Sequence, residues 1–274
     1  MAKTPRKTPP PVKVISLGEG ADNVFEGAWP NRSLKAITRP ELHVYSVKKP
    51  RARAIVCAGG GYVALVHDKE GVEVAQWLNG LGFEACVLVH RLPGASDGKG
   101  GVWPKDIALQ DGLTALEHLA GDGDLPLVWV GLSSGGHMAG VMACQPHVQQ
   151  PAALICAYGP LNANHKDYKY PPGKPDYPPA EKQAFYNDWP IGIAAAPHGV
   201  PKCPVFLAYA LHDTSVPVDH ALNFIRTGRD LSLDLDAHIF GLAPHGFALR
   251  DMDGTQDQWP KLAQAWLDRK LAKV

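Results

Sequence analysis

The sequence lacks a net charge, a long hydrophobic run and any paired spacing of cysteines. Lysine plus arginine and aspartate plus glutamate both number 27, so no overall field attracts the chain to nucleic acid or to an acidic membrane surface. The longest nearly apolar run, residues 54–66, is broken by three glycines and is shorter than the roughly 20 residues that a membrane span needs. We therefore expect neither nucleic acid nor a membrane as a partner.

The few cysteines and the N-terminal segment indicate where the protein works. Residues 1–13 are basic and proline-rich with no apolar segment behind them, so we expect a flexible tail, no secretory signal and a cytoplasmic protein. The cysteines are scattered, and most lie in or beside apolar stretches, so buried free thiols are expected rather than disulfides or a metal site. The five are Cys57, Cys86, Cys144, Cys156 and Cys203.

What is present is the composition of an ordinary globular chain, with 45% hydrophobic and 20% charged residues among 274. Two alternating segments, 12–17 and 41–47, predict an antiparallel edge. The predicted strands after them are 54–58, 85–89, 127–130, 152–158, 205–210 and 237–240, and the predicted helices are 68–78, 105–119, 134–144, 218–227 and 256–271. This alternation is typical of an α/β fold, here one domain over residues 14–274, with a mostly parallel sheet flanked by helices.

Residues 159–204 break this rhythm with many prolines, several tyrosines and no sustained period. So long a stretch without regular structure inside a compact domain is typical of a functional lid, and we interpret it as a cap over the active site. A merely variable insertion is the alternative. Its aromatic side chains would offer flat faces to a sugar or aromatic group, or would pack the cap as its own small core. They are Tyr168, Tyr170, Tyr177, Tyr186 and Trp189.

Two segments match the pattern Gly-x-Ser-x-Gly. The first, around Ser96, lies in a glycine-rich loop that no helix follows, so we interpret it as a loop. The second, around Ser133, directly follows a predicted strand and precedes a predicted helix, which is the context of a nucleophile elbow. Ser133 is therefore the predicted nucleophile, and the backbone N–H of Ser134, at the helix start, is predicted to stabilise an oxyanion.

A serine hydroxyl needs a base and an orienting acid. Asp213 lies in the segment directly after the predicted strand 205–210, and His245 lies in the loop after the predicted strand 237–240. Both are therefore expected at the strand ends where Ser133 lies. The order serine, aspartate, histidine is that of the α/β-hydrolases. Asp219 is the alternative acid, and His137 is set aside as a base because it lies on the nucleophile's own helix.

Three consecutive glycines, residues 59–61, follow the first predicted parallel strand. Neither G-x-G-x-x-G nor G-x-x-x-x-G-K-[ST] is present, which argues against a phosphate-binding loop. Because bare backbone can approach a ligand closely, we predict that Gly60 and Gly61 form the oxyanion hole with the Ser134 N–H. The predicted substrate contacts are Tyr62, beside these glycines, and Trp189 in the cap.

Seven short motifs over about residues 40–270 resemble the bacterial acetylxylan-esterase and feruloyl-esterase-like branch of the α/β-hydrolases. They are CAGGGY (57–62), KEG (69–71), HRLP (90–93), WPxD (103–106), GLSSGGHMAG (131–140), HDTSVP (212–217) and PHGF (244–247). The resemblance implies that Ser133 is the nucleophile, Asp213 the acid and His245 the base, with Gly60 and Gly61 in the oxyanion loop. It also implies cofactor-free hydrolysis of small-molecule or saccharide esters, often acetyl groups on plant polysaccharides.

Several alternatives stay open at this point. The predicted triad does not separate esters from amides, so a formamidase, an amidase or a peptidase of the same fold fits as well, and so does a binding protein that has lost catalysis. The oligomeric state is also left open. Ser134 stands where many members of the branch have alanine, a change that keeps the backbone N–H. Arg91 is predicted to pair with a carboxylate such as Asp106 or Glu70.

Overall fold

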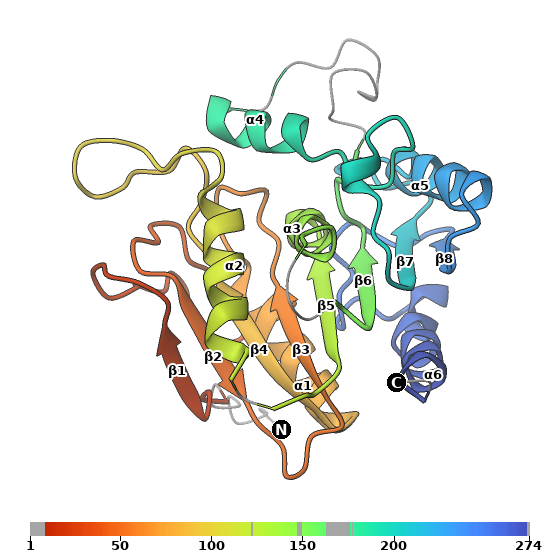
Figure 1. Ribbon diagram of the computed structural model, residues 1–274, viewed down its shortest axis with the longest axis horizontal. Helices are drawn as coiled ribbons and strands as arrows, with labels where there is room; N and C mark the ends of the chain where they lie inside the picture. The colour runs from red at the N-terminus through yellow and green to blue at the C-terminus, as the bar shows by residue number, and fades with distance from the viewer. Residues whose placement is uncertain (1–8, 122, 147–149, 163–175, 177, 273–274) are drawn as a thin grey trace.

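The computed structural model describes residues 9–121, 123–146, 150–162, 176 and 178–272. Within these ranges, eight strands form one sheet in the order β1-β2-β4-β3-β5-β6-β7-β8. β2 pairs antiparallel with β1 and β4, and the remaining neighbours pair parallel (Figure 1). The strands are β1 Lys13–Ser16, β2 Glu41–Tyr45, β3 Ala52–Cys57, β4 Phe83–Val89, β5 Leu127–Leu132, β6 Ala153–Ala157, β7 Val205–Ala210 and β8 Leu235–Phe240. The predicted mostly parallel sheet with an antiparallel edge is confirmed.

Helices cover both faces of the sheet, which explains why most strands are continuous apolar runs rather than alternating ones. On β3, Ile55 and Cys57 belong to the core cluster that includes α2, α3 and α5. Ala54 and Val56, the alternate residues, belong to the cluster that includes α1 and α6. The helices are α1 Glu73–Gly80, α2 Ile107–Leu119, α3 Ser134–Ala143, α4 Ala180–Asp188, α5 Asp219–Asp230 and α6 Trp259–Leu271.

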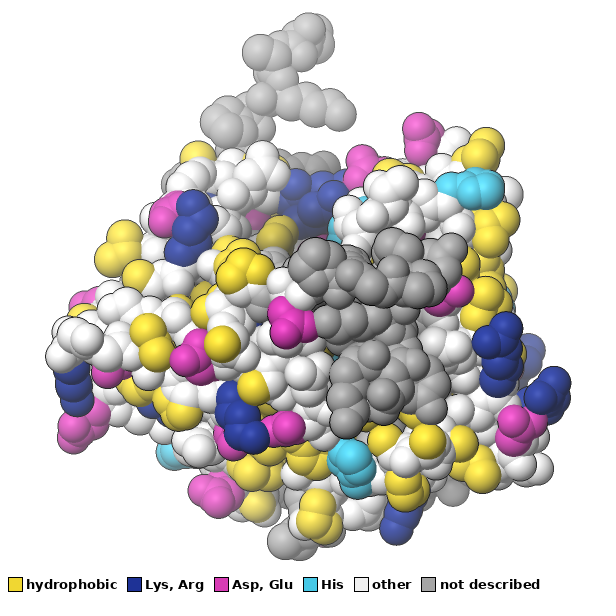
Figure 2. All heavy atoms as spheres, turned by 90° about the horizontal axis from the view of Figure 1, so that it is seen from above, with side chains coloured by type: hydrophobic (Ala, Val, Ile, Leu, Met, Phe, Trp, Pro, Cys, Tyr) yellow, Lys and Arg dark blue, Asp and Glu magenta, His cyan; other side chains and the backbone are white. Residues whose placement is uncertain are grey.

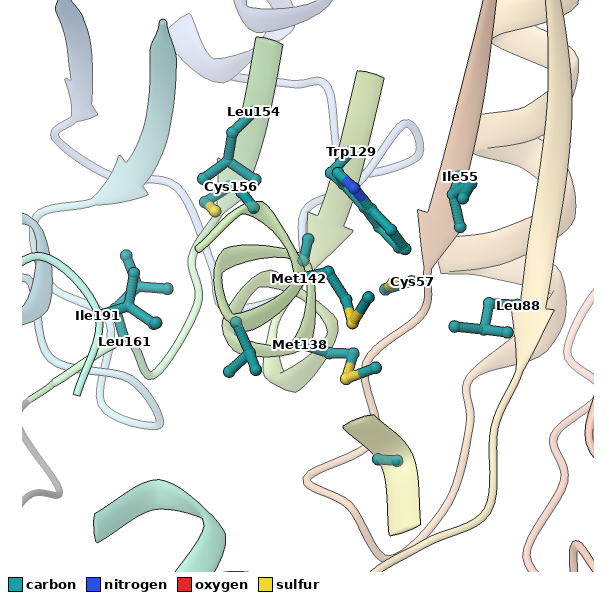
Figure 3. Packing of buried hydrophobic residues seen from close by; sticks show 14 of the residues in the cluster. Ile55, Cys57, Leu88, Trp129, Met138, Met142, Leu154, Cys156, Leu161 and Ile191 are labelled. Atoms are coloured by element: carbon teal, nitrogen blue, oxygen red, sulfur yellow. The ribbon is translucent and has the colours of Figure 1, made fainter. Parts of the chain in front are cut away.

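The helix α3 packs on the middle of the sheet, against β3, β5 and β6. This packing fixes the position of Ser133, the residue immediately before the helix. Met138 and Met142 project from α3 toward Cys57 on β3, and Trp129 on β5 lies beside them (Figure 3). A Cβ atom added to Gly112 of α2 would lie 2.5 Å from the Met142 sulfur, so these two helices approach closely. All five cysteines are free, three of them buried and two partly buried, as expected.

Two local elements differ from the sequence prediction. The predicted helix 68–78 consists of a π-helical segment, His67–Val72, that continues into α1. The helix α4 falls in the segment interpreted as a cap and is not revealed by an apolar period. Its buried residues include the polar Lys182 and Gln183 beside Phe185 and Tyr186, so a repeat of apolar side chains is missing.

Of the segment 159–204, predicted as a cap, the structure describes residues 159–162, 176 and 178–204. Figure 1 shows α4 beyond the carboxyl ends of the parallel strands. Residues 163–175 and Tyr177, which include Tyr168 and Tyr170, lie outside the described residues, so the extent of a cap stays a prediction. Seen from above, the described part of this face carries lysine and arginine interspersed with aspartate and glutamate (Figure 2).

The predicted pairing of Arg91 with a carboxylate is confirmed, but the partner is Asp111, and the two partners suggested, Asp106 and Glu70, are wrong. The guanidinium of Arg91 binds the carboxylate of Asp111 in a bidentate manner, with Nε 3.0 Å from Oδ1, and lies over the ring of Trp103. Asp111 is a buried residue of α2, whereas Asp106 is the residue immediately before that helix. The Ser96 segment is a loop, as expected, in which the Ser96 hydroxyl accepts the Gly98 N–H.

No helix in the described part of the chain is both long and apolar enough to cross a membrane.

An ion pair between Asp68, in the π-helical segment, and Arg32 makes the stability of the fold depend on pH. The Asp68 carboxylate is fully buried and accepts two hydrogen bonds from the Arg32 guanidinium. Burial opposes its ionisation, but the hydrogen bonds from His67 and Arg32 outweigh burial and lower the pKa of Asp68 to about 2. Because the pKa in an unfolded chain is about 4, ionised Asp68 stabilises the fold above that pH and the contribution is lost as pH falls toward 2.

We expect Asp68→Asn to reduce the free energy of unfolding at pH 7 by about 1–3 kcal/mol, because the partly buried Arg32 loses its partner. The deficit relative to the unsubstituted protein should shrink between about pH 4 and pH 2, where Asp68 becomes protonated in both states. Urea unfolding followed by circular dichroism at pH 7, 4 and 2.5 measures this. A deficit that stays constant over the range would contradict the assignment.

Candidate active site

Ser133 sits on a sharp turn between β5 and α3, with φ 50° and ψ −130°. This backbone conformation is strained for a residue with a side chain, and it is possible here because the neighbouring backbone is crowded and fixed. A Cβ atom on Gly131 would lie 2.0 Å from the Gly135 carbonyl oxygen, and one on Gly135 would lie 1.9 Å from that of Cys57. Both flanking glycines are therefore required by close backbone contacts.

The structure brings together the three side chains predicted as nucleophile, base and acid. The Ser133 Oγ lies 3.2 Å from Nε2 of His245, and Nδ1 of His245 lies 2.6 Å from Oδ2 of Asp213. The Asp213 side chain is fully buried, and its other oxygen accepts the N–H groups of Ser215 and Val216. An ionised Asp213 fixes the Nδ1–H tautomer of His245, which turns the Nε2 lone pair toward the serine hydroxyl.

The alternative acid does not make this contact. Asp219 is the first residue of α5, and the carboxylate that meets His245 comes from Asp213. His137 does not act as the base for Ser133, because one of its ring nitrogens binds the Tyr62 hydroxyl and the other binds the Trp189 carbonyl.

The predicted oxyanion donors lie beside the serine. Gly60 and Gly61 have φ 131° and 65°, and a Cβ atom on Gly60 would lie 2.2 Å from the Ala64 carbonyl oxygen. Both glycines line the same cavity as Ser133 and Ser134. The Gly61 N–H already donates to the Ser134 hydroxyl at 2.9 Å, a contact that sequence reasoning on the Ser134 backbone missed. An oxyanion can compete for this N–H only by displacing the hydroxyl.

A cavity of about 500 Å³ opens above these groups. Its walls combine apolar side chains with a small number of polar ones, as in most sites for small ligands. The lining residues are Gly60, Gly61, Val63, Val66, Lys69, Glu70, Ser133, Ser134, Pro160, Lys182, Tyr186, Ser215, Val216, His245 and Gly246. Of the aromatic residues predicted in the cap, Tyr186 is the described one that reaches this cavity.

The two predicted substrate contacts, Tyr62 and Trp189, are not among the residues that line this cavity, and their contact with a substrate stays a prediction. Tyr62 is only 2% exposed, and its hydroxyl donates to Nδ1 of His137 at 3.0 Å. The ring of Trp189 packs against His198, and its carbonyl accepts from Nε2 of His137 at 2.8 Å. Burial lowers the pKa of His137 to about 4, so the neutral ring donates on one side and accepts on the other. These two hydrogen bonds link Tyr62, next to the glycine loop, through His137 of α3 to Trp189 at the end of α4.

Two buried side chains beside the triad were not assigned from the sequence. Glu70, in the KEG motif, lines the cavity, and Tyr158 follows β6 and packs against the His245 ring. Its place in the KEG motif was the available signal for the first. Burial raises the pKa of Glu70, which the Gly59 N–H and the Tyr158 hydroxyl oppose.

Within the described ranges, no three histidine, cysteine, aspartate or glutamate side chains are grouped so that they could hold a metal ion.

Comparisons with known proteins assign the chain to a family. A family model described as the prolyl oligopeptidase family matches residues 104–274, which include Ser133, Asp213 and His245. None of the curated proteins matches the chain.

Solved structures resemble the whole chain. An acetyl ester-xyloside bifunctional hydrolase from Caldicellulosiruptor lactoaceticus is 22% identical with a TM-score of 0.65, over 95% of this chain and 97% of that one. A thermophilic esterase from Thermogutta terrifontis is 18% identical with a TM-score of 0.68, over 97% and 94%. An α/β hydrolase from a Medee basin deep-sea metagenome is 20% identical with a TM-score of 0.63, over 96% and 99%.

At these identities the structures establish a shared fold, and the expected α/β-hydrolase fold is confirmed. The family model extends over well more than half of the chain, from residue 104 to residue 274. The protein is thus a serine hydrolase of the α/β-hydrolase fold and belongs to the prolyl oligopeptidase family.

Proposed function

We propose that this protein is a serine carboxylic-ester hydrolase that cleaves short-chain esters, such as acetyl esters, through an acyl-enzyme. One observation carries the proposal: the Ser133 hydroxyl lies 3.2 Å from an imidazole nitrogen whose ring is held by a buried carboxylate at 2.6 Å. A serine hydroxyl is a poor nucleophile at neutral pH unless such a base takes its proton. The arrangement makes that transfer possible without movement of the backbone.

The steps use this chain's own side chains and water. The Ser133 Oγ attacks the ester carbonyl carbon as its proton passes to Nε2 of His245, and Asp213 stabilises the imidazolium. The N–H groups of Gly60 and Ser134 face the developing oxyanion, joined by that of Gly61 once it leaves the Ser134 hydroxyl. The imidazolium then protonates the departing alkoxide. Water, activated by the same histidine, cleaves the acyl-enzyme and restores Ser133.

The cavity supports a short acyl group. It holds about 500 Å³ in total, and Val63, Val66 and Val216 give it apolar walls. Both the acyl and the alcohol parts of a substrate have to share this space near Ser133. The hydrolase from Caldicellulosiruptor lactoaceticus is named for an acetyl ester and a xyloside, which makes acetylated sugars the first natural substrates to try.

Amide hydrolysis is a second candidate, because the family that matches is named for a peptidase. The same triad can protonate a leaving amine through His245, so its geometry alone does not separate the two bonds.

A substrate panel tests the proposal. We expect kcat/KM for p-nitrophenyl acetate to exceed that for the octanoate by roughly 10-fold or more, because a longer acyl chain has to compete with the alcohol part for the space near Ser133. We also expect the acetate and acetylated xylo-oligosaccharides to be cleaved faster than a feruloyl ester, an aryl formamide and a prolyl p-nitroanilide. Initial rates, corrected for reactions without enzyme, measure this. Faster cleavage of the prolyl anilide than of every ester would contradict the proposal and favour amide hydrolysis, the second candidate.

A further inference from the structure

A second buried carboxylate lies against the catalytic groups. Glu70 belongs to the π-helical segment His67–Val72, is 4% exposed, and lines the cavity that contains Ser133 and His245. A buried carboxylate is costly unless its oxygens are hydrogen-bonded, and both oxygens of Glu70 are. Their partners belong to different parts of the site.

One oxygen holds the start of the oxyanion loop. The Gly59 N–H donates to Oε2 of Glu70 at 2.8 Å. A Cβ atom on Gly59 would lie 2.5 Å from this oxygen and 2.5 Å from Cβ of Ser133, so the peptide is clamped between the two residues. On the far side of the loop, the Gly61 N–H is held by the Ser134 hydroxyl. The direction of the Gly60 N–H is therefore set from both sides.

The other oxygen faces the histidine. The Tyr158 hydroxyl donates to Oε1 of Glu70 at 3.2 Å, and the Tyr158 ring stands edge-on to the His245 ring with centroids 5.2 Å apart. A Cβ atom on Gly246 would lie 3.7 Å from the same oxygen, so the carboxylate abuts the backbone next to His245.

We propose that Glu70 is a positioning residue for the proposed ester hydrolysis. Its carboxylate fixes Gly59 so that the loop 59–61 faces the oxyanion, and its negative charge favours the imidazolium that His245 forms during attack. The inference rests on the proposed function, since both effects act on the same acyl transfer. Asp213 orients His245 through Nδ1, and Glu70 adds a second negative charge from the side of the oxyanion loop.

Four groups around Glu70 favour its ionised form, against the effect of burial. Burial raises its pKa, while the Gly59 N–H, the Tyr158 hydroxyl and the charges of His245 and Lys69 oppose this. Lys69 also donates to Asp251 at 3.1 Å. The other charged groups that face this region are Lys182 on α4, which lines the same cavity, Asp213 behind His245, and His67 and Asp68 on the same helical segment.

The variant Glu70→Gln removes the charge but keeps the size and one acceptor oxygen. We expect kcat on p-nitrophenyl acetate to fall roughly 10- to 100-fold with KM within about 3-fold, because loss of an oxyanion donor costs about 100- to 1,000-fold and here a donor is displaced rather than removed. The acid limb of the kcat/KM profile should move to lower pH. Without a negative neighbour the imidazolium is less favoured, so the neutral histidine that the reaction needs persists further into acid.

The matched control is Glu41→Gln, the same change at another buried glutamate, which pairs with Arg39 and His43 and does not line the cavity. Its pH profile and kcat should equal those of the unsubstituted protein. Labelling of Ser133 by a fluorophosphonate across the same pH range gives a second profile that needs no ester. If Glu70→Gln does not fold, Glu70→Asp withdraws the carboxylate from Gly59, and it should lower kcat while keeping the acid limb nearer its original place.

The outcomes separate the two proposals. An unsubstituted protein that cleaves none of the esters overturns the proposed function. If it cleaves esters but the acid limb of Glu70→Gln stays in place, or Glu70→Asp retains full kcat, the role of Glu70 is overturned and the ester hydrolase stands.

Discussion

Replacing Ser133 with alanine should lower kcat on p-nitrophenyl acetate by roughly 10⁵- to 10⁶-fold and leave the fold intact. The substitution removes the one oxygen that lies 3.2 Å from Nε2 of His245, and with it the acyl-enzyme route. Alanine keeps the Cβ atom, so the strained turn at φ 50° is neither relieved nor disturbed. Steady-state rates with a far-ultraviolet circular dichroism spectrum and a thermal melt measure both parts.

Ser96→Ala is the matched control, because Ser96 lies in the chain's other Gly-x-Ser-x-Gly segment and in a loop. Its activity should be unchanged, and a fluorophosphonate adduct should be found on Ser133 by mass spectrometry of the unsubstituted protein. The Thermogutta terrifontis esterase, which shares the fold, is phosphoramylated by tabun. Turnover that is retained in Ser133→Ala but lost in Ser96→Ala would show that Ser96, and not Ser133, is the nucleophile.

Asp213→Asn should lower kcat by roughly 10³- to 10⁴-fold, the second largest effect. The amide removes the negative charge that stabilises the imidazolium, and its NH₂ group, if it faces Nδ1, forces the proton of His245 onto Nε2. That nitrogen would then face Ser133 as a donor instead of a base. Steady-state kinetics at pH 8 with saturating ester measure the loss.

Asp219→Asn is the control for this prediction, since Asp219 was the other acid that the sequence allowed. Its kcat should stay within about 2-fold of the unsubstituted value, as for a surface substitution without a special role. A large loss in Asp219→Asn with a small one in Asp213→Asn would reverse the assignment.

Much of the fold follows from local pattern. The strands are apolar on both faces because helices cover both, so their sequences are short continuous runs that periodicity finds. Ser133, Asp213 and His245 are widely separated along the chain. Ser133 directly follows β5, and Asp213 and His245 lie in the loops after β7 and β8. Carboxyl ends of parallel strands meet at one edge, so position along the chain was enough to bring the three side chains together.

The rest depends on contacts that no local pattern encodes. The buried face of α4 is partly polar because Lys182 borders the cavity, so the helix has no apolar period. Tyr62 was expected at the substrate because it adjoins the glycine loop, but a buried hydroxyl needs a partner and finds it in His137. The two oxygens of Glu70 bind different parts of the chain, Gly59 in the preceding loop and Tyr158, 88 residues away.

The crowding at Gly131 and Gly135 has a consequence for how such proteins diversify. With carbonyl oxygens about 2 Å from where a Cβ would stand, no side chain is admissible there whatever the acyl group. The Gly-x-Ser-x-Gly signature thus records the clearance between two backbone segments and carries no information about substrate choice. Selectivity has to reside in walls such as Val63 and Tyr186, which can be exchanged while the nucleophile's cradle stays untouched.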